Sequence, residues 1–326
     1  MEPLISLIIP NRNGAGTIGQ CLDSIISNAD KLIEVIVVDD CSSDRSVEII
    51  KQYAVRLIRL EHHAGASAAR NIGARNSKGD ILFFIDADCL LQEDTLVNAR
   101  RAVKKHGVAA VIGGTYAREP QDPGFFNSFQ ALFVNYFETK RPESPDYIAA
   151  HACLIAAEVF RKSNGFPEEF LPIIEDVEFS HRLRRTGHRL IMDPAIQVKH
   201  IFNFNLVRSV RNAVRKTRYW VRYSLANRDL FADSGTASRE LKVNVASCLL
   251  CLVLFGMWLV TSDARFLYPL PIIVGVNGMA NRGLIRAFAE TKGAFFAVLA
   301  YTYYATLYAL AVGTGALLGI LEYIVR

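Results

Sequence analysis

The chain has 326 residues, a formal net charge of +5 and a hydrophobic content of 51%. This length allows one large domain and a smaller region, and the hydrophobic content is high for a soluble enzyme. Residues 1–242 carry nearly all the charge, whereas residues 243–326 are largely apolar. This distribution excludes a chain that is soluble throughout and predicts a membrane region after a soluble one.

Cysteine usage indicates a reducing compartment. The cysteines of the charged part of the chain have no spacing that suggests a disulfide framework. A CxxC pair, Cys248 and Cys251, lies inside an apolar span without an accompanying His or Cys pair, which favours helix packing or lipid contact. We therefore expect the soluble part to lie on the cytoplasmic side.

Apolar runs and helical periodicity alternate along the first 200 residues. The pattern predicts strands at 5–9, 34–38, 55–60, 81–85, 108–113, 148–156 and 189–200, and helices at 17–27, 44–53, 65–76, 93–106 and 177–186. Residues 120–145 mix aromatics, prolines and polar residues and give no prediction. Alternation of this kind is typical of βαβ units and predicts an α/β fold with a mainly parallel sheet.

Three acidic clusters mark the expected ligand edge of this sheet. They are Asp39-Asp40, the Asp86-Ala87-Asp88 turn and Glu175-Asp176. The first two follow apolar runs typical of buried parallel strands, and ligands collect at the carboxyl ends of such strands. An Asp-X-Asp pair can bind a hard divalent ion, and the third cluster is available for proton transfer.

Five segments together resemble the family 2 glycosyltransferases of GT-A fold. They are SLIIPNRNG, VIVVDDCSSD, HHAGASAARNIGARNSKGDILFFIDAD, GFPEEF and IEDVEFSHRLRRTGHRL. The likeness covers about residues 4–205 in the order and spacing of that family. It implies a GT-A nucleotide-sugar-binding sandwich at residues 1–203, with a nucleotide-sugar donor.

The resemblance implies a donor-binding set made of Pro10, Asn11, Asn13, Asp40, Arg70 and Asp86. In it, Asp40 accepts a hydrogen bond from the base of the nucleotide, above the loop of residues 10–13. Arg70 lies near the donor, and Asp86 contacts the ribose or the metal shell. Helix capping around Asp39-Asp40 and plain helix packing around Arg70 remain the alternatives.

The resemblance also implies a Mg²⁺ or Mn²⁺ site. Asp88 would coordinate the ion that bridges the donor diphosphate, with Asp86 and His200 as further ligands. The alternatives are a solvated acidic turn and a structural histidine.

The catalytic residues implied by the resemblance are Asp176 and Glu175. Asp176 would take the proton of the acceptor hydroxyl in an inverting transfer, and Glu175 would orient the acceptor or the base. Acidic residues also favour helix N-termini, so a purely structural role is the alternative.

Residues 204–242 form a basic amphipathic segment. Arginines recur at helical spacing beside an apolar stripe, and the set includes Arg208, Arg211 and Arg215. This pattern predicts an interfacial helix on anionic lipid, whose arginines bind a lipid headgroup or the phosphate of an acceptor. A solvated helix face is the alternative, and nucleic acid is not an expected partner.

Residues 243–326 are expected to form a transmembrane domain of about three helices. The expected crossings are 243–261, 266–280 and 294–325, the middle one interrupted by prolines. Basic residues between the last two crossings favour the cytoplasm, which predicts a multi-pass protein with a cytoplasmic catalytic domain. Small residues at Gly313, Gly315 and Gly319 allow a homo-oligomer.

The sequence therefore predicts a metal-dependent inverting glycosyltransferase that acts on a membrane-associated, lipid-linked acceptor. Two alternatives stay open: a processive polysaccharide synthase, and a membrane-tethered nucleotide-sugar-binding protein without turnover. The QxxRW signature of the synthases is absent, and three spans are few for a pore. His62, His63 and His151 receive no role from the sequence.

Overall fold

The computed structural model describes residues 2–168 and 173–325 and divides into two compact units. One unit, the sheet unit, consists of residues 1–123 and 138–203. The other, the helical unit, consists of residues 124–137 and 204–326. Residues 124–137, which lie in the stretch without a sequence-based prediction, are thus grouped with residues 204–326.

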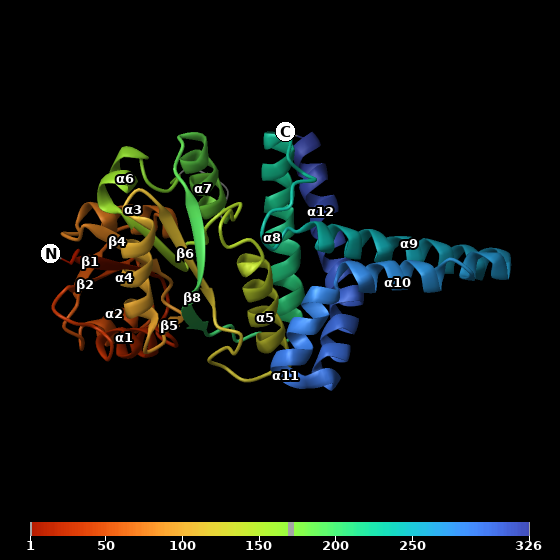
Figure 1. The fold of residues 1–326 in the computed structure, drawn as a ribbon, viewed down its shortest axis with the longest axis horizontal. Coiled ribbons are helices and arrows are strands. Elements are labelled where there is room, and N and C mark those ends of the chain that lie inside the picture. The colour runs from red at the N-terminus through yellow and green to blue at the C-terminus, as the bar shows by residue number, and fades with distance from the viewer. Residues whose placement is uncertain (1, 169–172, 326) are drawn as a thin grey trace. The chain divides into compact units, whose positions relative to one another are not determined.

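The sheet unit alternates strands and helices as the patterning predicts (Figure 1). Its strands are β1 Ile5–Asn11, β2 Ile33–Asp39, β3 Arg56–Arg59, β4 Ile81–Ile85, β5 Cys89–Leu91, β6 Val111–Tyr116, β7 Ala152–Ala156 and β8 Leu190–His200. Its helices are α1 Ile18–Ile26, α2 Ser46–Ile50, α3 Ala66–Arg75, α4 Thr95–His106, α6 Ala157–Lys162 and α7 Glu175–Arg185. The short elements β5 and α6 were not predicted, because three to six residues are too few for a periodic signal.

The strands form a mixed sheet in the order β3-β2-β1-β4-β7-β6-β8-β5. Strands β3, β2, β1 and β4 are parallel, β7 runs antiparallel to both of its neighbours, and β5 runs antiparallel to β8. Strand order reverses at β1, which lies between β2 and β4. A ligand crevice is expected at the carboxyl ends of strands at such a point, and Asp39 and Asp86 lie at these ends.

Apolar side chains from one face of the sheet form the main core. Ile8, Leu82 and Phe84 pack with aromatic residues that follow β7, including Phe160 and Phe179 of α6 and α7. Helices α3, α6 and α7 lie on one side of the sheet, whereas α1 and α2 lie on the other (Figure 1). This packing fixes α3 and α7, which carry two of the charged groups discussed below.

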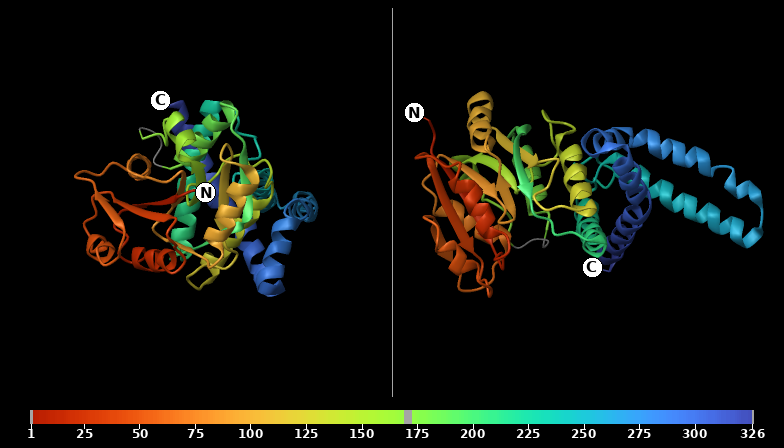
Figure 2. Two further views of the ribbon diagram at one scale, coloured as in Figure 1. Left: turned by 60° about the vertical axis from the view of Figure 1, so that its left-hand side comes forward. Right: turned by 90° about the horizontal axis from the view of Figure 1, so that it is seen from below.

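The helical unit contains helices of very different length. They are α5 Phe125–Thr139, which begins in this unit, α8 Leu206–Asn227, α9 Arg239–Thr261, the 3-10 turn η1 Ala264–Leu267, α10 Leu270–Ala280, α11 Arg282–Tyr303, the π-helical turn η2 Tyr304–Tyr308 and α12 Ala309–Ile324. Helices α9 and α10 lie side by side as an antiparallel hairpin (Figure 2). The buried Asn277 donates from Nδ2 to Oδ1 of Asn244 at 2.9 Å, which joins the two helices.

Two helical stretches of the described residues are long and apolar enough to cross a membrane. They are Arg239–Thr261 and Arg282–Ile324. The second stretch has a kink at Gly293, whose φ and ψ are not helical. Helix α10 has 11 residues, about 16 Å at 1.5 Å per residue, against a hydrocarbon core of about 30 Å. The middle crossing expected at 266–280 therefore stays a prediction.

The close packing of α3 on β1 gives a test of the fold. A Cβ at Gly73 would lie 2.4 Å from Cγ2 of Ile8, whereas a Cβ at Gly16 would meet no heavy atom within 4 Å. We expect Gly73→Ala to lower the free energy of unfolding by about 1–3 kcal/mol through overpacking. Gly16→Ala is the control, and equal midpoints of thermal unfolding for the two variants would contradict this packing.

Candidate active site

The two aspartates at the carboxyl end of β2, Asp39 and Asp40, form hydrogen bonds with different segments of the chain. Asp39 accepts hydrogen bonds from Nδ2 of Asn11 at 2.9 Å and from the backbone N–H of Ser42 at 3.1 Å, and so closes the turn. Asp40 accepts from the backbone N–H groups of Ala64 and Gly65 at 2.7 and 2.9 Å. Asp40 therefore fixes the start of α3, where Gly65 adopts a φ of 91° that favours glycine.

His63 is a neighbour of Asp40 that the sequence did not identify. Its Nδ1 lies 2.7 Å from Oδ2 of Asp40, and its Nε2 lies 2.5 Å from a guanidinium nitrogen of Arg12. The predicted donor residue Asp40 is thus already bound by three protein groups. The adjacent pair His62-His63, two residues before Gly65, was the available signal, but it has no spacing that points to Asp40.

The predicted loop of residues 10–13 lies beside these aspartates. Pro10 and Asn11 belong to β1, paired with Val38 and Asp39 of β2. Asn13 has a positive φ of 52°, and its side-chain oxygen accepts from the backbone N–H of Ser43 at 2.8 Å. The structure therefore brings Pro10, Asn11, Asn13 and the Asp39-Asp40 pair to one end of the parallel strands.

A single buried guanidinium joins two of the acidic clusters. Arg70 of α3 donates to Oδ1 of Asp86 at 2.6 Å and to Oε1 of Glu175 at 2.7 Å. Its side chain is 5% exposed, against 30% for Asp86 and 17% for Glu175. The sequence predicted Arg70 near the donor, but it gave no sign that this residue bridges two positions 89 residues apart in the chain.

The charges around Asp86 favour its ionised form. Burial by itself would raise the pKa of Asp86, but Arg70 and His151 outweigh it and lower that pKa. Burial likewise opposes the charge on Arg70, and the two carboxylates outweigh it and raise the pKa of the guanidinium. The Arg70–Asp86 pair is therefore a true ion pair in the folded chain.

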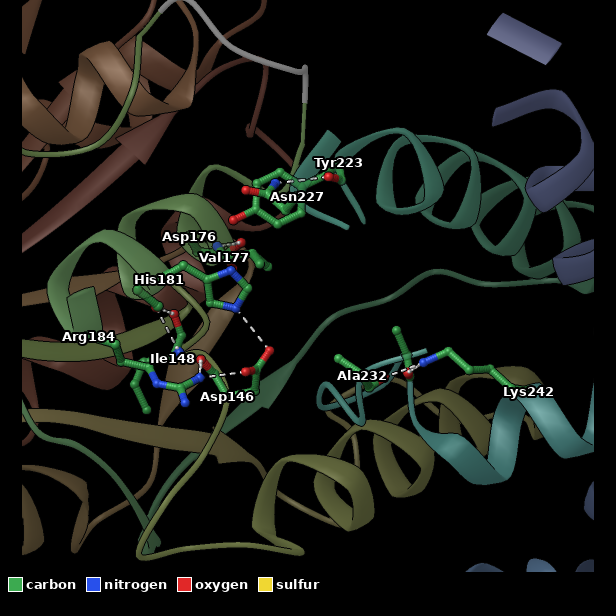
Figure 3. Close-up of polar contacts among 12 residues, drawn as sticks. Asp146, Ile148, Asp176, Val177, His181, Arg184, Tyr223, Asn227, Ala232 and Lys242 are labelled. Atoms are coloured by element: carbon green, nitrogen blue, oxygen red, sulfur yellow. Dashed lines mark hydrogen bonds and ion pairs between the residues drawn. The ribbon is translucent and has the colours of Figure 1, made fainter. Parts of the chain in front are cut away.

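Asp176 lies in the first turn of α7, directly after a strained residue. Ile174 has φ 70° and ψ 20°, which is unusual for a β-branched side chain and costs roughly 1–3 kcal/mol. The carboxylate of Asp176 accepts from the backbone N–H of Val177 at 2.9 Å (Figure 3). It also accepts from the backbone N–H of Ala150 at 3.3 Å. These contacts fix Asp176 between the N-terminus of α7 and the segment that leads into β7.

The loop before β7 is attached to α7 by a second set of contacts. Asp146 lies 2.9 Å from Nε2 of His181 and accepts from Arg184 at 2.6 Å (Figure 3). The backbone N–H of Ile148 donates to Oγ of Ser180 at 3.0 Å. These contacts attach the loop before β7 to α7, the helix that begins with the predicted catalytic residues Glu175 and Asp176.

A possible metal-binding group lies next to the Asp86-Ala87-Asp88 turn. Among the described residues, ligand atoms of Asp88, Cys89 and His200 all lie within 4.8 Å of one another. Nε2 of His200 is 3.4 Å from Oδ1 of Asp88. The structure brings together the predicted ligands Asp88 and His200, whereas the carboxylate of Asp86 is bound by Arg70.

The electrostatics of Asp88 suit a cation. Partial burial of Asp88 and the charge of Asp86 disfavour the ionised carboxylate and raise its pKa to about 7. A bound divalent ion would reverse this effect and hold Asp88 ionised. The ring of His200 is stacked on Phe202 at 4.1 Å and contacts the edge of Tyr116 at 4.8 Å, so its orientation is fixed.

A buried pair of opposite charges lies behind this group. Nε2 of His151 is 3.6 Å from Oε2 of Glu138, and both side chains are at most 7% exposed. Thr115 donates to the same oxygen of Glu138 at 2.7 Å, and the His151 ring stacks on Tyr116 at 4.0 Å. Burial opposes the charge on His151, but Glu138 outweighs it and raises the pKa of the imidazole.

The predicted basic residues of α8 fall into two sets. Arg208, Arg211 and Arg215 are exposed on one side of the helix. Further along, Arg218 and Arg222 form ion pairs with Glu322 of α12. Arg208, Arg211 and Arg215 therefore stay the predicted residues for headgroup binding.

The bridge made by Arg70 gives a second test. Arg70→Met removes the buried partner of two partly buried carboxylates, so we expect the free energy of unfolding to fall by about 3–5 kcal/mol. Arg75→Met on the same helix is the control, because Arg75 is 61% exposed and its pair with Glu168 spans 3.8 Å, so a loss under about 1 kcal/mol is expected. Denaturant unfolding monitors both, and equal losses would contradict the bridge.

Comparison with known proteins identifies the sheet unit. Residues 6–163 match the family model for glycosyl transferase family 2. The glycosyltransferase GlyA of Streptococcus pneumoniae is 30% identical over 178 residues, which cover 50% of this chain and 26% of that protein. Across the first four curated relatives, this chain covers between 26% and 59% of their length.

Two solved structures have a similar fold. A mannosyltransferase from Pyrobaculum calidifontis in complex with GDP-Man and Mn²⁺ has a TM-score of 0.60 at 18% identity, covering 99% of this chain and 88% of that one. GalNAc-T7 with UDP, GalNAc and Mn²⁺ has a TM-score of 0.50 at 17% identity, covering 68% and 50%. Both support the GT-A fold expected for residues 1–203. Residues 6–163 of the sheet unit therefore resemble family 2 of the glycosyltransferases, and the sheet unit has a GT-A fold.

Proposed function

We propose that this protein is an inverting, metal-dependent glycosyltransferase that moves a sugar from a nucleotide-sugar donor to a membrane-associated, lipid-linked acceptor. The observation that carries the proposal is the bridge from Asp86 through Arg70 to Glu175. It connects the turn suited to a metal and a diphosphate with the helix start that holds Asp176. A donor and a general base must lie this close for a single-step transfer.

The donor would lie along the carboxyl ends of β1, β2 and β4. Asp40 and the loop of residues 10–13 lie where the base is expected, and Asp86 lies nearer the ribose and diphosphate. Asp88 and His200 would hold Mg²⁺ or Mn²⁺, with Asp86 in its surroundings. When bound, this ion neutralises negative charge on the departing nucleoside diphosphate. Both solved relatives with this fold were obtained with Mn²⁺.

Asp176 is proposed as the general base. Its carboxylate accepts from two backbone N–H groups at 2.9 and 3.3 Å, which orient it. It would take the proton of the acceptor hydroxyl or phosphate while the anomeric carbon is attacked opposite the diphosphate. Glu175, fixed by Arg70, orients this region and needs no proton of its own.

The membrane acceptor is proposed from the helical unit. Two of its helical stretches are long and apolar enough to span a membrane, and α8 presents the exposed Arg208, Arg211 and Arg215. We place the sheet unit in the cytoplasm of a multi-pass protein, in keeping with six cysteines that are all unpaired. The arginines of α8 would then bind the phosphate of the acceptor or of anionic lipids.

A substrate screen tests the function directly. Purified protein is mixed with Mn²⁺ or Mg²⁺, a panel of uridine- and guanosine-diphosphate sugars, and membrane lipid extract, and products are followed by mass spectrometry. We expect one nucleotide sugar to give a glycolipid and free nucleoside diphosphate. Binding of nucleotide sugars without turnover for every donor would favour a non-catalytic binding protein instead.

Two substitutions separate the metal from the base. We expect Asp88→Asn to abolish metal-dependent turnover, and Asp176→Asn to lower kcat by about 10²–10⁴-fold while donor binding persists. Glu93→Gln, an exposed acid after the same turn, is the control and should keep full activity. Normal turnover of the Asp88 variant would remove the metal assignment.

The proposed role of the α8 arginines predicts that their loss weakens binding of the lipid acceptor and leaves the donor reaction with water unchanged. Replacing Arg208, Arg211 and Arg215 by Gln removes three charges worth about 1 kcal/mol each near an anionic surface, so the KM for the lipid acceptor should rise at least about tenfold. Hydrolysis of the donor by water should not change. The control variant replaces Arg101, Lys104 and Lys105 of α4, which are also exposed, by Gln and so removes the same charge. An equal rise of the KM for the lipid acceptor in both variants would contradict a specific role for α8.

A further inference from the structure

The thiol of Cys89 is the one member of the possible metal-binding group that the proposed function leaves without a role. Cys89 is fully buried, and its Sγ lies 3.9 Å from Oδ1 of Asp88. Its ligand atom falls within 4.8 Å of those of both Asp88 and His200. A thiol among carboxylate and imidazole ligands changes which ions a site prefers.

The backbone explains why these three side chains meet. Cys89 and His200 are directly paired across the antiparallel strands β5 and β8, so their side chains project from the same face. Asp88 lies in the turn closed by the hydrogen bond from the N–H of Cys89 to the carbonyl of Asp86 at 3.0 Å. The N–H of Ile201 donates to the carbonyl of Asp88 at 2.9 Å, which attaches that turn to the end of β8.

The separations are close to the edges of a coordination shell. Metal–ligand bonds of about 2.0–2.3 Å at tetrahedral angles place neighbouring nitrogen, oxygen and sulfur atoms about 3.3–3.7 Å apart. From Oδ1 of Asp88, Nε2 of His200 lies 3.4 Å away, within this range, and Sγ of Cys89 lies 3.9 Å away, slightly beyond it. The ligand atoms of Cys89 and His200 lie within 4.8 Å of each other. Small side-chain shifts would therefore complete a three-ligand site, with the remaining position open.

We propose that Cys89 is a protein ligand together with Asp88 and His200, so that this site binds a borderline-soft divalent cation such as Zn²⁺ or Co²⁺. Binding forms a metal–sulfur bond and releases the thiol proton to solvent, with no change of oxidation state. Mixed nitrogen, oxygen and sulfur ligands favour Zn²⁺ over Mn²⁺. The inference shares its site with the proposed function but does not depend on sugar transfer, because Zn²⁺ would bind here in competition with Mn²⁺.

Cobalt spectroscopy of the full-length protein tests the thiol directly. Co²⁺ bound through sulfur gives a near-ultraviolet charge-transfer band, which oxygen and nitrogen ligands alone do not give. We expect this band in the wild-type protein, its displacement by equimolar Zn²⁺, and its loss in Cys89→Ser. Cys21→Ser is the matched control, because Cys21 is equally buried beside this turn but directs its Sγ toward the carbonyl of Asp86 at 3.8 Å. It should keep the band.

A second measurement covers the case in which Cys89→Ser fails to fold. The heat of Zn²⁺ binding to the wild-type protein is measured in buffers of different ionisation enthalpy. The dependence of this heat on the buffer gives the number of protons released, and we expect the thiol proton to be among them. Where the serine variant folds, its affinity for Zn²⁺ should fall at least about tenfold. Absence of the charge-transfer band in the wild-type protein, or its persistence in Cys89→Ser, would overturn the inference, and neither result bears on nucleotide-sugar turnover.

Discussion

The ion bridge at Arg70 is the interaction on which the rest of the site depends. A guanidinium that is 5% exposed is stable only with carboxylates bound to it, and Asp86 and Glu175 supply them at 2.6 and 2.7 Å. Because Arg70 lies on α3, Asp86 follows β4 and Glu175 begins α7, the bridge fixes three elements at once. Any shift in the packing of α3 or α7 on the sheet would separate the two acidic clusters.

The acidic residues of the sheet unit differ in how their charge is compensated. Asp86 has Arg70, Asp40 has backbone N–H groups and His63, and Glu138 has His151. The pKa of Asp88 is raised to about 7, because partial burial and the charge of Asp86 disfavour its ionised form. This contrast supports the proposals that Asp86 organises the crevice and that Asp88 binds a cation. Under the further proposal, Cys89 and His200 influence which cation binds.

The helical unit meets a different physical constraint. Buried amide groups in an apolar unit cost free energy unless they are hydrogen-bonded. Nδ2 of Asn244 donates to the carbonyl of Tyr304 at 2.7 Å, where the π-helical turn η2 begins, and Nδ2 of Asn281 donates to Oδ1 of Asn277 at 2.8 Å. The bond from Nδ2 of Asn277 to Oδ1 of Asn244 at 2.9 Å then joins α10 to α9.

The sequence by itself determined the α/β class, the strands that precede the acidic clusters, the family resemblance of the sheet unit and the apolar C-terminal region, because periodicity and local motifs are properties of short segments. It also placed Asp88 and His200 together through the resemblance. Only the tertiary structure decided the partners of each charge: the double use of Arg70, the His63–Asp40 and His151–Glu138 pairs, and the pairing of Cys89 with His200. These contacts join residues far apart in the chain, so their distances follow from strand order and packing, which local patterns do not encode.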